Sequence, residues 1–144
     1  MAISNRDWVG RGFELLAAGL APYVERRMGA STGAAIDWRE PGSSLQDPSF
    51  LLRVMVQAWD RSFASELTKT DRNLVFELRD VRNRWAHNAS FSADDAYRAL
   101  DSLERLLTAA DAHEATEVGR AKKELMRQQF EAQARKATPS ADAL

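Results

Sequence analysis

Two helices and the turn between them are encoded in one stretch of the chain, VFELRDVRNRWAHNASFSADDAYRAL, residues 75–100. Before the turn, apolar side chains fall within about 60° of one another at 100° per residue, which predicts one buried stripe made of Leu74, Leu78, Val81 and Trp85. After the turn, Ser92 with Asp95 three residues later is a capping-box pattern. Asn88 suits the turn because asparagine tolerates the left-handed conformation. The stretch therefore predicts a helix that ends near Ala86 and a second helix that starts at Ser92.

The residues at the start of the chain predict a long first helix. Ser4 with Asp7 forms another capping-box pattern. A largely helical apolar face then runs from Asn5 to about Met28. Pro22 lies inside this segment and predicts a kink or a break there, because proline lacks the backbone N–H that a helix interior needs.

A loop and a second helix are predicted between these segments. Residues 29–46 are rich in glycine, proline and serine, with Trp38 as an apolar residue that pins the loop. Asp47 followed by Pro48 is typical of a helix start, with the aspartate as N-cap and the proline in the first turn. The helix that carries the buried stripe is expected to be capped by Thr70 or Asp71.

After Asp111 the apolar content falls, which predicts a weaker and more exposed fifth helix with a thin stripe made of Val118, Leu125, Met126 and Phe130. No run of alternating apolar residues indicates a strand. We therefore predict an all-α bundle of about five helices. Its domain boundaries are expected at residues 1–136, with residues 137–144 as a tail or the start of a linker to a further domain of a longer chain.

Composition limits the chemistry that the chain can perform. It has 144 residues, no cysteine, two histidines far apart in sequence and a formal net charge of -1. We predict no structural metal and no cofactor, because no metal-ligand spacing is present. The net charge argues against a protein that coats nucleic acid but leaves room for a local basic site. No signal peptide or membrane span is evident, which predicts a cytoplasmic protein.

The candidate functional residues are Arg82, Asn83 and His87. A guanidinium can hold phosphate oxygens in a bidentate contact, and an imidazole can move a proton near neutral pH. In a continuous helix, His87 would lie about 140° around from Arg82, too far for both to reach one phosphate easily. We therefore expect His87 to lie in the turn after the helix.

Structural roles compete with this interpretation for three residues. Asp80 and Arg84 are spaced i,i+4, so Arg84 can be half of a surface ion pair. Trp85 continues the apolar stripe, which favours a core position over a base-stacking platform. His87 can also serve as a helix C-terminal residue that caps carbonyls.

Around these residues the chain resembles the HEPN superfamily of small α-helical domains. Its ribonuclease members carry an arginine, a polar residue and, a few residues later, a histidine. The longer stretches resemble one branch, which is shared with a eukaryotic nuclear transcript-surveillance endoribonuclease and with N-terminal domains of large bacterial ATPase or helicase-like proteins. The resemblance extends from roughly Ser4 to Lys136 and rests on residues 7–16, 50–59, 75–87 and 91–100.

This resemblance implies a role for each motif residue. Arg82 would bind the scissile phosphate of an RNA, Asn83 would orient the phosphate or the histidine, and His87 would be the acid-base residue. It also implies a metal-independent endoribonuclease or an RNA-binding domain in a stress or phage-defence setting, and a homodimer through the face that bears the Arg82–His87 motif. The alternative is a catalytically silent dimerisation or docking module of a larger ATPase-type protein.

Overall fold

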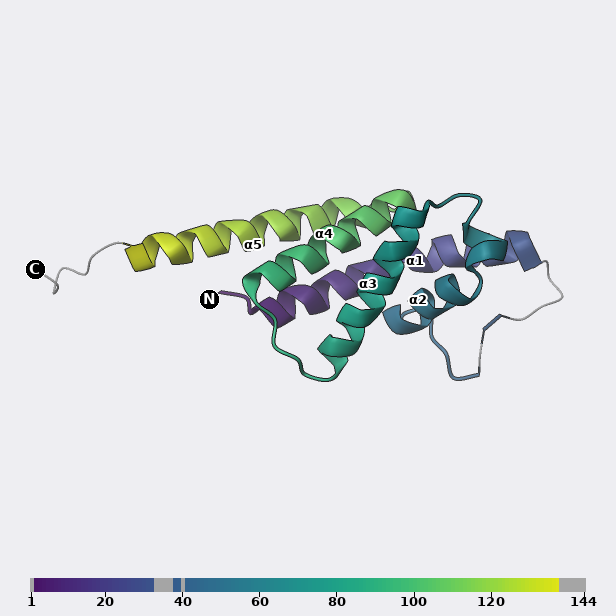
Figure 1. Ribbon diagram of the computed structural model, residues 1–144, viewed down its shortest axis with the longest axis horizontal. Coiled ribbons are helices and arrows are strands. Elements are labelled where there is room, and N and C mark those ends of the chain that lie inside the picture. Colours follow the sequence, from purple (N-terminus) through teal and green to yellow (C-terminus); the bar gives the residue numbers. More distant parts are fainter. Residues whose placement is uncertain (1, 33–37, 40, 138–144) are drawn as a thin grey trace, which may run out of the picture.

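Six helical segments make up the computed structural model, which describes residues 2–32, 38–39 and 41–137. They are α1 (Asn5–Thr32), α2 (Pro48–Gln57), the short π-helix η1 (Trp59–Phe63), α3 (Lys69–Ala86), α4 (Ala93–Ala109) and α5 (Glu114–Ala137) (Figure 1). No strand occurs in the described part of the chain. The predicted all-α bundle is confirmed. Residues 138–144, where most of the predicted tail falls, lie outside the described residues.

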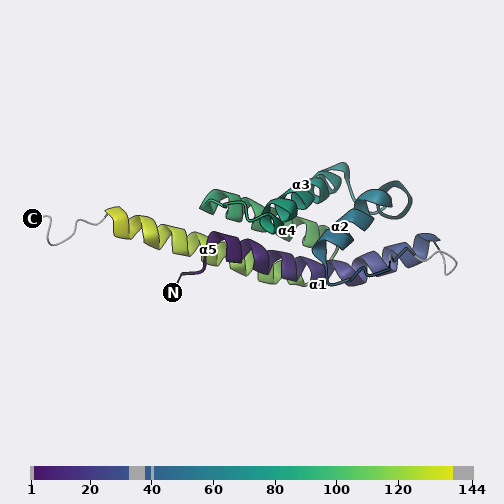
Figure 2. The ribbon, with the colours of Figure 1, turned by 90° about the horizontal axis from the view of Figure 1, so that it is seen from below.

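The helices form two groups. α1, α4 and α5 pack against one another along the long axis of the molecule, while α2 and α3 pack on each other (Figures 1 and 2). α2 also contacts α1, and α3 also contacts α4. The C-terminal half of α5 extends past the other helices (Figure 1). None of the described helices is long and apolar enough to cross a membrane.

The first helix is longer than its sequence indicated. α1 continues through Pro22 to Thr32, so the helix does not break at Pro22, and the predicted end near Met28 is wrong. Pro22 is exposed, whereas Leu20, Val24 and Met28 are buried in the core. Burial of the residues on both sides of the proline explains why the helix continues despite the lost backbone hydrogen bond.

Side-chain caps fix the starts of the later helices. Asp47 caps α2 with Pro48 in the first turn, and Ser92 and Asp95 form the capping box of α4, both as predicted. The predicted cap of α3 at Thr70 or Asp71 is wrong, because Thr68 is the N-cap. The Thr68 hydroxyl accepts from the Asp71 amide at 3.2 Å, and the Asp71 carboxylate accepts from the Thr68 amide at 2.8 Å. Asp71 therefore serves as the acidic partner three residues into the helix.

The core follows the predicted apolar faces with exceptions at its edges. On α3 the buried residues are Val75, Leu78 and Val81, while Leu74 and Trp85 are only partly buried. Trp38 is partly buried and stacks on Phe50 with ring centroids 6.1 Å apart, as expected for a residue that pins the loop. On α5 the expected stripe is split, because Met126 and Phe130 remain 54% and 74% exposed.

Two glycines of α1 make a matched test of close helix packing. A Cβ added at Gly12 would lie 2.6 Å from Leu103 Cδ1 and 2.9 Å from Leu100 Cδ2, whereas one at Gly29 would meet nothing within 4 Å. Gly12→Val is expected to lower the free energy of unfolding by about 1–3 kcal/mol through overpacking. Gly29→Ala is expected to raise it by roughly 0.5–1 kcal/mol through helix propensity. Urea unfolding measures both, and equal effects would contradict this packing of α1 on α4.

Candidate functional site

The end of α3 is held by backbone hydrogen bonds of the Schellman type. Ala89 N–H donates to the carbonyl of Arg84 at 2.9 Å, and Asn88 N–H donates to that of Trp85 at 3.3 Å. Asn88 has a φ of 59°, the left-handed conformation that this cap requires. His87 is the C-cap residue, and its side chain is exposed. The predicted helix end and the position of His87 in the turn are confirmed.

The far side of the turn is tied to the start of α4. Arg84 approaches the Asp95 carboxylate at 3.9 Å and lies over the Phe91 ring at 5.2 Å. The backbone hydrogen bond from Ser92 holds the pKa of the Asp95 carboxyl below its usual range. Within the described residues, the expected pair between Arg84 and Asp80 is not formed. Arg84 pairs instead with Asp95 of the next helix, which the turn brings opposite Arg84.

Trp85 joins the end of α3 to the start of α1. Its indole N–H donates to the backbone carbonyl of Arg6 at 3.1 Å. Its ring lies so close to α1 that a Cβ added at Gly10 would be 3.1 Å from Trp85 Cζ2. The side chain is partly buried, with its apolar body packed against the core cluster. This is typical of tryptophan, since its N–H needs a partner when the ring is buried.

Two arginines make cation–π contacts with this indole. The guanidinium of Arg6 lies 4.5 Å from the Trp85 ring centroid, and that of Arg82 lies 5.2 Å from it. Such contacts stabilise a cation by about 0.5–2 kcal/mol. Nη1 of Arg6 is buried and has no hydrogen-bond partner. Sequence reasoning missed Arg6, because nothing in its local sequence connects it to a tryptophan 79 positions away.

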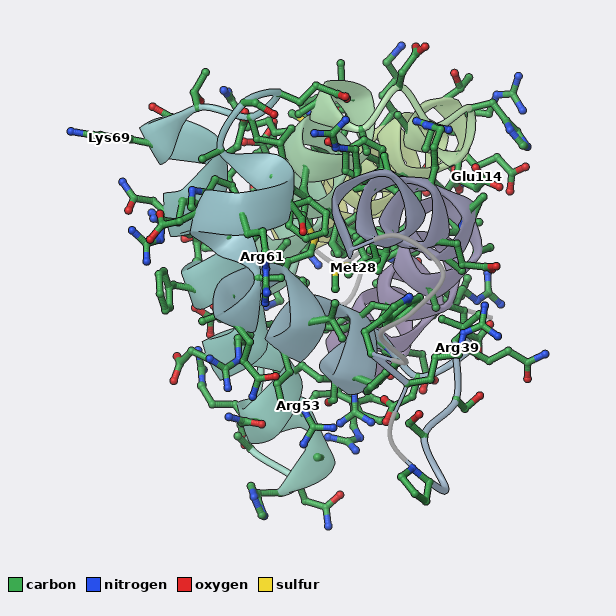
Figure 3. The ribbon with its side chains drawn as sticks, turned by 90° about the vertical axis from the view of Figure 1, so that its right-hand side faces the viewer. Met28, Arg39, Arg53, Arg61, Lys69 and Glu114 are labelled. Carbon is green, nitrogen blue, oxygen red and sulfur yellow. The ribbon has the colours of Figure 1, made fainter. Side chains whose placement is uncertain are left out.

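Asn83 lies on the side of α3 that faces α2. It helps to line a hollow of about 200 Å³ with Arg79 and with residues of the α2 end, namely Asp47, Ser49, Phe50 and Arg53. In the view of Figure 3, Arg53 lies below Arg61. Asp47 is engaged as the cap of α2, since its Oδ1 accepts from the Ser49 amide at 2.9 Å. The hollow is therefore next to the motif and lined by cationic and polar groups.

The three predicted site residues thus occupy the last turn of α3 and its C-cap. The backbone of Asn83 and His87 is joined by a 3.0 Å hydrogen bond, but no hydrogen bond links the Arg82 and His87 side chains in the described part of the chain. His113 lies at the other end of α4, about 25 Å away along a 17-residue helix. Across residues 2–32, 38–39 and 41–137, no three His, Asp or Glu side chains gather where they could hold a metal ion.

A comparison with known protein families identifies the family of this chain. A family model described as Swt1-like HEPN matches residues 11–111, more than two thirds of the 144-residue chain. The chain belongs to the Swt1-like HEPN family. The match is shorter than the resemblance from Ser4 to Lys136, and it leaves Arg6 and α5 outside the matched range.

HEPN membership favours a ribonuclease or RNA-binding role, and HEPN domains often dimerise. The comparisons with curated proteins and with solved structures gave no significant match. The motif Arg82, Asn83 and His87 lies inside the range that the family model covers.

The turn that carries His87 can be tested at Asn88. Glycine has no Cβ and adopts a φ of 59° without cost, so Asn88→Gly is expected to change the free energy of unfolding by no more than about 0.5 kcal/mol. Asn88→Val is expected to lower it by about 1–2 kcal/mol, because a branched Cβ clashes in the left-handed conformation. Urea unfolding of both variants decides the matter. An Asn88→Val variant as stable as Asn88→Gly would mean that this turn has another conformation.

Proposed function

We propose that the chain is a metal-independent, cytoplasmic endoribonuclease that acts in stress or phage defence. The observation that carries the proposal is the end of α3, where Arg82 rests against Trp85 and His87 is exposed on a fixed turn one residue past the helix. A positioned guanidinium and an accessible imidazole are the groups that RNA cleavage without a metal requires. Membership of the HEPN family supports the same role.

The reaction starts from the RNA itself. Its 2′-hydroxyl oxygen attacks the adjacent phosphorus, the O2′–P bond forms, and the P–O5′ bond breaks. One imidazole accepts the proton of the 2′-hydroxyl, and an acid donates a proton to the departing O5′. Arg82 neutralises charge on the phosphate oxygens, and Asn83 orients the phosphate or the histidine. The products are a 2′,3′-cyclic phosphate and a 5′-hydroxyl.

A second copy of the chain supplies the remaining proton-transfer group. One imidazole cannot easily accept the 2′-hydroxyl proton and protonate O5′ in the same step, because the two roles need opposite protonation states, and His113 lies at the opposite end of α4. A two-fold symmetric homodimer through the face bearing Arg82 and His87 would place two motifs in one cleft. The dimer therefore belongs to the same proposal as the catalysis.

A competing function is a catalytically silent docking module of a larger ATPase-type protein. The observation that favours it is an apolar hollow of about 320 Å³ between α4 and α5, lined in part by Tyr97, Leu125, Met126 and Phe130. Exposed apolar side chains that gather in one place often mark sites where proteins associate. This hollow involves none of the motif residues.

Cleavage of single-stranded RNA in the presence of EDTA tests the enzyme. Arg82→Ala and His87→Ala are each expected to lower the cleavage rate by roughly 10²- to 10⁴-fold, because each removes charge stabilisation or proton transfer. Gel analysis of end-labelled RNA identifies the cyclic phosphate ends. His113→Ala is the matched histidine control, since that side chain is 88% exposed and pairs only with Glu114 in the described part of the chain. Absence of cleavage by every stably folded variant, wild type included, would favour the docking module.

Light scattering at micromolar concentration tests the composite site. The wild-type chain is expected to have twice the mass of its 16.1 kDa monomer. Substitutions on the motif face should shift it toward the monomer, whereas Phe130→Ser on α5 should leave the dimer intact. A wild-type chain that cleaves RNA as a strict monomer would rule out the two-motif cleft.

A further inference from the structure

The charged residues of α3 are segregated on two sides of the helix. At 100° per residue, Glu77, Asp80 and Arg84 fall within about 60° of one another. Arg72, Arg79, Arg82 and Asn83 fall within about 100° of one another on a different side. The first group lines a hollow with α4 residues, and Arg79 and Asn83 line the hollow with α2.

On the α4 side Glu77 and Arg84 each have an oppositely charged partner on α4. Glu77 accepts a hydrogen bond from Arg98 Nε at 2.6 Å, and Arg84 lies 3.9 Å from the Asp95 carboxylate. The Glu77 carboxylate raises the pKa of Arg98, which is already charged at every physiological pH. The one arginine of this group, Arg84, is therefore already paired, and this side of α3 offers an anionic ligand no unpaired cation among the described residues.

On the other side of α3, the arginines of this helix have no such partners among the described residues. Within the described residues, Arg72, Arg79 and Arg82 form no ion pair, and neither does Arg6 beside Trp85. Nε of Arg72 and Nη1 of Arg6 are buried without a hydrogen-bond acceptor. An arginine nitrogen left in this state costs stability, since buried donors are normally paired. These four guanidiniums, called the arginine row below, therefore lack an anion.

Aromatic rings lie beside three of the four arginines of the row. Arg82 and Arg6 lie over Trp85, and Arg72 lies 6.0 Å from the Trp59 ring centroid and 5.6 Å from that of Phe76. A ring beneath a guanidinium fixes its plane but does not neutralise its charge. The guanidinium nitrogens other than Arg72 Nε and Arg6 Nη1 remain available to an anion such as a phosphate.

We propose that the arginine row is the track for the backbone of single-stranded RNA, which holds phosphates adjacent to the one bound at Arg82. The inference rests on the proposed function and extends it to the substrate, a single strand several nucleotides long. From Arg72 to Arg82 the row runs about 15 Å along the helix axis, which several consecutive phosphates can follow. Arg79 shares its hollow with Asn83, so the track is continuous with the motif.

The experiment measures binding of the full chain to a non-cleavable, fully 2′-O-methylated RNA of ten nucleotides at several salt concentrations. Arg72→Ala and Arg79→Ala are each expected to reduce the slope of log K against log salt by about 0.7, as loss of one phosphate contact does for single strands. Binding at 0.1 M salt should weaken roughly 3- to 10-fold for each variant. Arg98→Ala, which removes an arginine of α4 that is already paired with Glu77, should leave both quantities unchanged.

A shorter RNA and a conservative variant separate binding from folding. A four-nucleotide RNA should bind wild type and Arg72→Ala equally, because it does not reach the far end of the row. Arg72→Lys should keep the salt slope of wild type, since it retains the charge. If Arg72→Ala melts at a much lower temperature than wild type, the Arg79→Ala and Arg72→Lys results decide alone.

The possible results distinguish this inference from the proposed function. If wild type cleaves RNA and Arg82→Ala does not, but Arg72→Ala and Arg79→Ala bind like Arg98→Ala, only the track is overturned. If wild type neither binds nor cleaves RNA, both fail. Binding of a poly-glutamate peptide through the same arginines, without binding of RNA, would identify a docking surface for an acidic protein segment and overturn the track.

Discussion

The hydrogen bond from the Trp85 indole to the Arg6 carbonyl joins the end of α3 to the start of α1, and the candidate site depends on it. It places the last turn of α3 against the first turns of α1, where Gly10 leaves room for the ring. The same ring supports the guanidiniums of Arg82 and Arg6. One contact therefore positions the motif arginine, brings in a second arginine and fixes the helix end from which His87 projects.

Net charge is a poor guide to what this surface binds. The chain carries a formal charge of -1, which by itself argues against a nucleic-acid-binding protein. The fold separates the charges of α3, so that Glu77 and Arg84 are neutralised by α4 residues while Arg72 and Arg79 are not. Local potential depends on which charges remain unpaired, and counterion release at phosphates responds to that local potential.

Two errors of sequence-based prediction share a cause. Pro22 was expected to kink or break α1, but burial of Leu20 and Val24 on either side keeps the helix continuous. Arg84 was expected to pair within its own helix, but the turn after α3 brings Asp95 opposite it. In each case a local preference worth about 3 kcal/mol or less was outweighed or redirected by packing between helices.

By itself the sequence determined the helical fold class, most of the helix starts and the end of α3 at the motif, because capping boxes and left-handed caps involve residues a few positions apart. The sequence also indicated Arg82, Asn83 and His87 as candidate site residues and the family of the chain, because both are recognised from sequence patterns alone. Tertiary structure alone decided that Arg6 lies beside Trp85, that Asn83 shares a hollow with Arg79 and α2, and that one side of α3 keeps its positive charge. These features depend on contacts between residues far apart in the chain, which no local pattern encodes.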